Sequence, residues 1–222
     1  MNGTYATISA DIISSTSLSE NSHTELSIKI KDFLNQLSTQ YSGFWGRLVK
    51  GDSIECITEN PNEALRIAIL LKTFIKSYTP IDGISNPKFK HFGLRLVIGI
   101  GEMRTNNKEL DIMDGEAIYL SGRTLNNMKN KATDTFQIVT NNNNEPYKAL
   151  PIIAALLNQI INKATNRQCE TLFYKLQYKT DNEVANIMDT SRQNVNNNLN
   201  NLGWDAIEQT ILYFEQINFQ TL

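Results

Sequence analysis

The feature that most constrains the fold of this chain is a change in the spacing of its apolar residues near residue 141. Before that point, segments with the two-residue alternation of a strand are followed by segments whose apolar residues recur every three or four positions. From residue 145 on, only the helical spacing is present. The junction, Asn141–Asn144 followed by Glu145-Pro146, is typical of a loop. The sequence therefore predicts an α+β domain over residues 1–144 and a small all-α domain over 145–222.

The segments of the first part follow an order known from small α+β domains. The predicted strands are Thr4–Asp11, Phe44–Lys50, Ser53–Thr58, Gly93–Gly101 and Thr135–Thr140, and the predicted helices are His23–Tyr41, 60–77 and Gly115–Lys129. Residues 80–87, and His91 beyond them, are expected to lie in loops. The order β-α-β-β-α-β with a further α-β predicts a ferredoxin-like, split βαβ sheet with its helices on one face.

Composition removes several classes of protein. With 21 basic and 23 acidic residues and 41% hydrophobic residues, the chain is neither disordered nor a globally basic nucleic-acid coat. The longest apolar run, Leu150–Leu157, is far shorter than the roughly 20 residues of a membrane span. No signal-peptide pattern is visible, so we expect a cytoplasmic protein without membrane contact. Cys56 and Cys169 lack CxxC spacing, and we expect neither a zinc site nor a disulfide.

Two carboxylates are candidates for a metal site. Asp11 ends the first strand, and Asp52 lies in the turn between the second and third strands. In a split βαβ sheet these strands are neighbours, so both carboxylates are expected at one edge. Two carboxylates with phosphate oxygens and water suit Mg²⁺ or Mn²⁺. Aspartates in turns are also common without any metal, and that alternative stays open.

A third element gives these positions a context. In Asp114–Arg123 a basic residue follows a glycine by eight positions on a predicted helix. Together the segments resemble the class III nucleotide cyclase domain through Asp11, Ile12, Ser15 and Thr16, through Gly51-Asp52, and through Gly115, Ile118, Ser121 and Arg123. The resemblance implies metal ligation by Asp11 and Asp52, binding of a nucleoside triphosphate near Ser15, Thr16 and Gly51, and a catalytic role for Arg123. It also implies a head-to-tail homodimer.

The sequence departs from the cyclase pattern at two positions. Tyr119 stands where the family has the asparagine that orients the ribose, and Leu48 stands where it has the residue that reads the purine. An apolar side chain cannot hydrogen-bond a base, so we expect turnover to be absent or slow. A second resemblance covers nearly the whole chain: the small bacterial SatD family shares the Asp-Ile start, the Gly-Asp hairpin, the Ile98–Glu102 strand and a C-terminal helix-turn-helix.

The helix-turn-helix is predicted from about residue 181 to 200. Asp181–Met188 and Ser191–Asn200 have helical spacing, with Val195 and Leu199 on the inner face of the second helix. Residues of types that read base edges lie on its outer face: Arg192, Gln193, Asn194, Asn196 and Asn197. However, residues 150–222 hold five basic and seven acidic residues, whereas phosphate binding needs a basic surface. Both DNA binding and packing inside the protein remain open.

The sequence is therefore compatible with three functions. The first is a regulatory protein, a transcriptional regulator with a degenerate cyclase-like domain that binds a nucleotide or metal and a DNA-binding C-terminal part. The second is an active nucleotidyl cyclase or related nucleotide-processing enzyme. The third is a non-catalytic module that binds another protein. The first function predicts a sequence-specific shift of DNA in a gel, and the second predicts release of pyrophosphate. The third predicts neither result.

Overall fold

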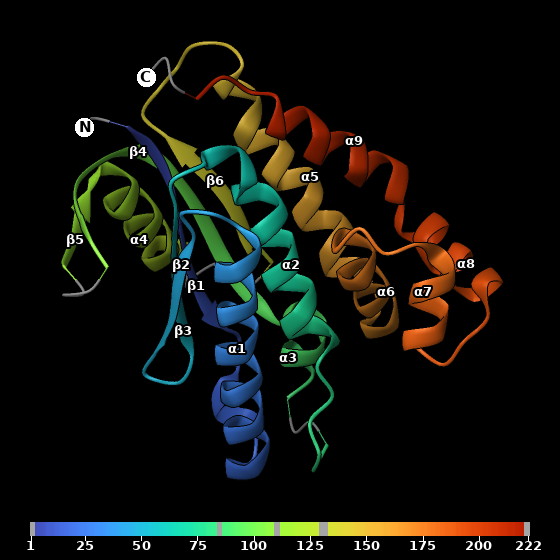
Figure 1. Ribbon diagram of the computed structural model, residues 1–222. Coiled ribbons are helices and arrows are strands. Elements are labelled where there is room, and N and C mark those ends of the chain that lie inside the picture. The colour runs from blue at the N-terminus through green and yellow to red at the C-terminus, as the bar shows by residue number, and fades with distance from the viewer. Residues whose placement is uncertain (1–2, 84–85, 109–111, 129–132, 220–222) are drawn as a thin grey trace.

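The computed structural model describes residues 3–83, 86–108, 112–128 and 133–219 (Figure 1). The strands are β1 (Thr4–Ile12), β2 (Trp45–Val49), β3 (Ser53–Thr58), β4 (Leu94–Asn107), β5 (Ile112–Gly115) and β6 (Phe136–Thr140). The helices are α1 (Glu20–Gln40), α2 (Ala64–Ser77), α3 (Pro87–Phe92), α4 (Glu116–Met128), α5 (Leu150–Lys163), α6 (Asn166–Leu176), α7 (Asp181–Ile187), α8 (Arg192–Leu202) and α9 (Trp204–Glu215). The prediction of a mixed α and β protein with a largely antiparallel sheet is confirmed.

The sheet has the strand order β2-β3-β1-β4. These strands are antiparallel, with Asp11 opposite Ser53 on one side of β1 and opposite Arg95 on the other. The free edge of β4 is shared: β6 pairs in parallel with Leu96–Ile100, and β5 pairs antiparallel with the end of the strand. The register places the end of β1 beside the β2–β3 turn, where the candidate carboxylates lie.

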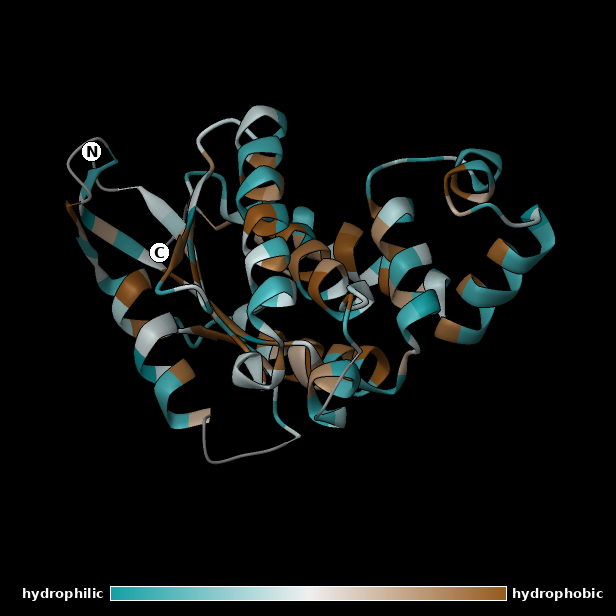
Figure 2. Cartoon of the chain, turned by 90° about the horizontal axis from the view of Figure 1, so that it is seen from below, coloured by the Kyte–Doolittle hydropathy of each residue, from teal (hydrophilic) through white to brown (hydrophobic). Residues whose placement is uncertain are grey.

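The helices do not share one face of the sheet, so that expectation was wrong. Helix α4 lies on the face opposite α1 and α2, and Figures 1 and 2 both show the sheet between them. The physical reason is that β4 is buried on both sides. Leu96 and Ile98 belong to the core under α2, whereas Val97 packs with Leu125 and Met128 of α4. The strongly apolar run of β4 is typical of a strand covered on both faces.

Two elements were not expected from the sequence. Residues 87–92 form the short helix α3, so His91 lies on a helix and not in a loop. Asn86 caps this helix by accepting from the Lys88 N–H, and Pro87 takes the first helical position. Strand β5 has four residues, too few for an alternation to be visible in the sequence. Both elements border hollows on the surface.

The C-terminal helices pack on the α1 and α2 side of the molecule. Phe33 of α1, Phe74 of α2 and Phe173 of α6 form an aromatic cluster with ring centroids 4.6 to 5.4 Å apart. One apolar core includes residues of the sheet and of α5, α6 and α9, and it therefore crosses the expected boundary at residue 144. The division into two independently folding domains stays a prediction. No helix among the described residues is long and apolar enough to span a bilayer.

Helices α7 and α8 have a small apolar core of their own. Its members are Val184, Ala185, Met188, Val195 and Leu199, and Tyr174 and Trp204 cover it from α6 and α9. Thr180 and Ser191 cap the two helices by accepting from backbone N–H groups of the first turn. The polar face of α8 is therefore left outside both cores.

Candidate functional site

The two candidate carboxylates lie together at the end of β1. The Ser53 Oγ donates to Asp11 Oδ1 at 2.9 Å and lies 3.4 Å from Asp52 Oδ1, so one hydroxyl touches both side chains. A backbone hydrogen bond also links the two segments, since the Ile12 N–H donates to the Asp52 carbonyl at 2.8 Å. The hairpin turn is thus fixed against the strand end. Ser53 was not singled out from the sequence, although its position next to Asp52 and opposite Asp11 follows from the strand register.

The turn that carries Asp52 has an unusual backbone. Lys50 and Gly51 both have positive φ, 53° and 82°. A side chain at Gly51 would be strained, and its Cβ would come within 2.8 Å of the His23 ring. His23 of α1 therefore packs against the turn. Glycine at 51 is explained by this backbone and this neighbour, and a role in nucleotide binding stays a prediction.

The segment after β1 was expected to bind the nucleotide. Residues 15–17 form one turn of 3₁₀ helix, entered through Ser14 with φ of 57°. Ser15 is buried and its Oγ lies 3.5 Å from Asp52 Oδ2, whereas Thr16 is exposed. Ser15 thus lies beside the carboxylates and Thr16 faces solvent. The Asn86 side chain also donates to Ser14 Oγ at 3.2 Å and ties this turn to the start of α3.

The donor set fits one kind of cation. The described residues contain no group of three or more His, Cys, Asp or Glu side chains that could hold a metal. Asp11 and Asp52 therefore supply two carboxylates and no third protein ligand of these types. Mg²⁺ is commonly held by one or two carboxylates, with water and substrate phosphates completing its octahedron. The pair suits a cation that arrives with a phosphorylated ligand.

Arg123 lies in a separate hollow. A depression of about 530 Å³ is bordered by residues of α4 and β5 and by Arg104 and Asn141. Arg123 is exposed on its wall, with its guanidinium carbon 5.2 Å from the centroid of the Tyr119 ring. Asp11 and Asp52 do not line this hollow. The structure therefore brings the two carboxylates together but does not join Arg123 to them within one chain.

The open side of the sheet near β2 presents charged residues. Leu48 packs against the main core, which agrees with its inability to read a base. Its neighbour Arg47 points to the opposite face, where it pairs with Glu55 at 2.9 Å. Arg47 and Glu55 line a small hollow of about 160 Å³ together with Ser9 and Trp45. The alternation of side chains along β2 predicts that Arg47 and Leu48 face opposite sides of the sheet.

The five candidate DNA-reading residues lie on the outer side of α8. Arg192, Gln193, Asn194 and Asn197 are exposed, and Asn196 is partly exposed. The next residue, Asn198, instead donates to Thr171 Oγ1 at 3.1 Å and so fixes α8 against α6. Sequence reasoning did not separate this structural asparagine from the others, because only the docking of α8 on α6 distinguishes them.

The charges beside α8 are largely paired. Lys175 forms an ion pair with Asp181 at 2.6 Å, and both side chains are about one-fifth exposed. Arg167 pairs with Glu170 at 2.8 Å and also donates to the Met188 carbonyl at 2.5 Å. The helix-turn-helix itself therefore offers few cations, in agreement with the charge of residues 150–222.

The chain was compared with family models, curated proteins and solved structures. No family model matches the chain, and no curated protein matches it. Among solved structures, the non-canonical dimeric guanylyl cyclase domain of the RhoGC fusion protein from the aquatic fungus Blastocladiella emersonii is similar to this chain. The two are 17% identical, the match covers 62% of this chain and 79% of that one, and the TM-score is 0.43.

Proposed function

We propose that this protein is a regulator that binds DNA through α8 and binds a nucleoside triphosphate with Mg²⁺ or Mn²⁺ through its sheet. In this proposal the first part is a cyclase-like domain of the split βαβ type and the last part is a helix-turn-helix domain, as in the SatD family. The observation that carries the proposal is the exposed polar face of α8, which lies outside both apolar cores.

The side chains on that face have the chemistry of base readers. Asparagine and glutamine can form two hydrogen bonds with adenine in the major groove, and arginine can do so with guanine. Burying amides without partners would cost on the order of 1–3 kcal/mol each, so these residues need water or a polar partner. Helix α8 is held from behind by Val195 and Leu199. A rigid helix with a polar outer face is the form in which many proteins enter the major groove.

Replacing two of these residues should remove sequence preference. We expect parent protein to select a preferred sequence from a randomised duplex library. The double variant Arg192→Ala, Asn196→Ala should bind that sequence at least about 30-fold more weakly, since each of the two base contacts contributes about 1–3 kcal/mol. Fluorescence anisotropy measures the affinity, with Gln209→Ala on the exposed face of α9 as control. Retained preference in the double variant would contradict the assignment of α8.

A second proposed function is nucleotide binding at the carboxylate pair. Its support is the contact of Ser53 Oγ with both Asp11 and Asp52. Each phosphate oxygen adds a hard ligand that two carboxylates alone cannot supply, so cation and nucleotide are expected to bind together. Ser15 and the backbone at Gly51 are proposed to border the phosphates, with Thr16 on the solvent side.

Asp52→Asn should abolish stabilisation by the metal nucleotide. At a ligand concentration about 100 times the Kd, binding stabilises the parent by about 2.7 kcal/mol and raises its Tm. The variant should lose this shift because it removes one of the two carboxylates proposed to hold the cation. Thermal-shift titrations with MgATP, MgGTP and the Mn²⁺ complexes measure it, and Asp32→Asn on the exposed side of α1 is the matched control. Equal shifts in Asp52→Asn and parent would exclude the metal site.

Turnover is proposed to be absent or slow. Within one chain, Arg123 borders a hollow that Asp11 and Asp52 do not line. Arg123 can therefore stabilise phosphate charge at the carboxylates only if it comes from a second chain. Leu48 faces the core, and Tyr119 replaces the ribose-orienting asparagine. The competing proposal, an active nucleotidyl cyclase, requires release of pyrophosphate from MgATP or MgGTP.

A homodimer is proposed for the same reason. Two chains arranged head to tail would let Arg123 of one approach Asp11 and Asp52 of the other, and a two-fold dimer is also the common form of helix-turn-helix proteins. We expect light scattering at tens of micromolar protein to give twice the 25.2 kDa of one chain. A mass of one chain would contradict the head-to-tail arrangement.

A further inference from the structure

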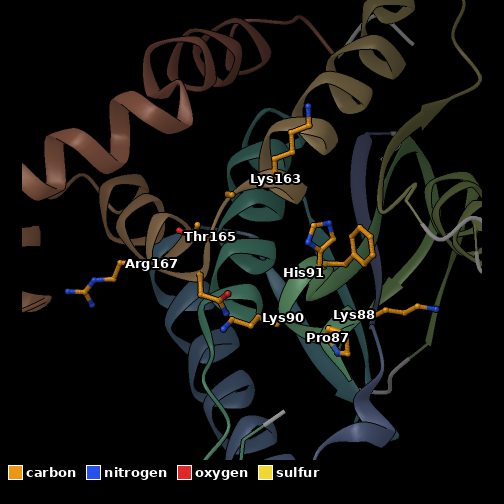
Figure 3. Close-up of a pocket in the computed structure, with 10 residues that line it drawn as sticks. Pro87, Lys88, Lys90, His91, Lys163, Thr165 and Arg167 are labelled. Carbon is orange, nitrogen blue, oxygen red and sulfur yellow. The ribbon is translucent and has the colours of Figure 1, made fainter. Parts of the chain in front are cut away.

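A basic hollow lies between α3 and the start of α6 (Figure 3). Its volume is about 780 Å³, and it is bordered by residues 87–92 and 163–167. Five of the bordering residues are basic in type, namely Lys88, Lys90, His91, Lys163 and Arg167, and all five are exposed. None of the described residues that border it is acidic. The two segments are far apart in sequence, so this concentration of basic residues exists only in the fold.

Most of these basic groups are not neutralised. Within the described part of the chain, Lys88, Lys90 and Lys163 have no ion pair, whereas Arg167 pairs with Glu170. A bordering set of cations without acidic partners favours a negatively charged ligand.

The arrangement of the cations indicates what kind of anion fits. In Figure 3, Lys88 and Arg167 point to opposite sides and Lys163 points away from both. A compact anion such as a free phosphate would need the donors to converge on one point. Cations spread around a hollow instead suit a chain of phosphates that passes across it. The backbone of a nucleic acid has this form, with charges spaced regularly along it.

The hollow is also joined to the helix-turn-helix. Arg167 borders it and donates to the carbonyl of Met188, the residue that ends α7. Arg192 follows Met188 by four residues, so the two Cα atoms are at most about 14 Å apart. The major groove is about 12 Å wide, so a helix lying in it has backbone phosphates on either side.

We propose that this hollow binds the phosphate backbone of the duplex whose major groove receives α8. The inference rests on the proposed DNA-binding function and supplies the partner surface that the helix-turn-helix lacks. The cations come from α3 and from the α5–α6 junction, which are outside the helix-turn-helix. Helix α8 then reads the bases, and the hollow contributes affinity that does not depend on sequence.

The test compares two double variants on a fluorescein-labelled 40-base-pair duplex of mixed sequence. Lys88→Gln with Lys163→Gln removes a cation from each side of the hollow, and Lys31→Gln with Lys148→Gln removes two exposed cations elsewhere. Anisotropy is measured from 50 to 200 mM KCl. The first variant should lower the slope of log affinity against log salt by about 2 and weaken binding on the order of 10-fold at 100 mM. The control should keep the slope and affinity of the parent.

The other outcomes separate the two proposals. Parent-like binding by the hollow variant overturns this inference and leaves the role of α8 standing. Equal losses in both double variants also overturn it, because they indicate a general effect of charge. If the hollow variant is weakened and the Arg192→Ala, Asn196→Ala variant keeps its preference, the hollow binds backbone and α8 does not read bases. Failure of the parent to bind DNA, or displacement of the duplex by stoichiometric inorganic triphosphate, overturns the inference.

Discussion

Gly99→Ala is expected to lower the free energy of unfolding by about 3 kcal/mol. Gly99 lies in β4 where α4 crosses it, and a Cβ there would be 2.3 Å from the Ala117 carbonyl oxygen and 2.8 Å from the Ser121 nitrogen. These are backbone atoms, so the helix must move for the methyl group to fit. Urea unfolding followed by circular dichroism measures the loss.

Gly122→Ala is the matched control on the same helix. A Cβ at Gly122 meets nothing within 4 Å, and the residue is inside α4. Since glycine is about 0.5–1 kcal/mol less favourable than alanine within a helix, this variant should be more stable than the parent. Similar losses in both variants would show that α4 does not rest on Gly99.

This contact also determines where Arg123 lies. The Thr7 Oγ1 of β1 donates to the Ala117 carbonyl at 2.8 Å, and the Ser121 Oγ lies 2.9 Å from the hydroxyls of Thr7 and Ser9. Small residues on both partners therefore let the helix approach the sheet closely. A shift of α4 in Gly99→Ala would move Arg123, which follows Ala117 by six residues on the same helix, and the hollow that it borders.

Strand spacing predicted most of the sheet, because alternation is a local property of the chain. β1, β3 and the two helices predicted within residues 181–200 match the expected ranges within a few residues. The neighbourhood of Asp11 and Asp52 followed from strand order alone. The face covered by α4 did not, because an apolar strand such as β4 is compatible with helices on either side. The packing of Val97 with Leu125 and Met128 and the close contact at Gly99 are both properties of the folded structure.

The basic hollow could not be found from the sequence for a different reason. Lys88 and Lys163 are in segments that have no local relation, and neither segment is rich in basic residues over a long stretch. Helix α3 was expected to be a loop, although Asn86-Pro87 has the same capping pattern as Asn60-Pro61. The packing of α5 against β6 and of α6 against α2 brings the two segments together. A surface of this kind is a property of the tertiary structure.

The helices on the core side of the sheet contain two buried lysines. Lys72 and Lys76 of α2 are 0% and 1% exposed. The Lys72 Nζ donates to the Leu94 carbonyl at 2.6 Å and to Thr135 Oγ1 at 2.9 Å, and the Lys76 Nζ donates to the carbonyls of Ile161 and Asn162 at the end of α5. No carboxylate pairs with either in the part of the chain that the structure describes. The ammonium groups are thus held by neutral acceptors.

We expect the protein to become more stable as the pH rises from 6 to 8.5. Burial lowers the pKa of Lys72 to about 7, with Lys76 and Arg95 adding repulsion, and burial also lowers the pKa of Lys76. Between pH 7 and the usual lysine pKa of about 10.4, the unfolded chain therefore binds more protons than the folded one. Stability rises with pH under that condition. For Lys72 alone the gain between pH 6 and 8.5 is about 2 kcal/mol.

Above pH 8.5 other groups act in the opposite direction. Burial raises the pKa of Cys169 to about 11 and also raises the pKa values of Cys56 and Tyr41. These groups keep their protons in the folded protein after the unfolded chain has lost them, so their contribution to stability falls as the pH rises further. Up to pH 8.5 their opposing contribution stays smaller than that of the lysines, because unfolded thiols begin to lose their protons only near that pH.

The contribution of Lys72 is measured as a difference between two proteins. Urea unfolding at pH 6 and pH 8.5 gives the gain for the parent and for Lys72→Met, which keeps the length of the side chain and removes the ammonium. The gain should be about 2 kcal/mol smaller in the variant, whatever the change in its absolute stability. Should Lys72→Met fail to fold, Lys76→Met provides the same comparison, with a smaller gain than the parent expected from the lowered pKa of Lys76. An identical gain in parent and variant would show that the buried ammonium keeps its ordinary proton affinity. The acceptors at Leu94 and Thr135 would then stabilise a full charge in the core that links α2 to the sheet.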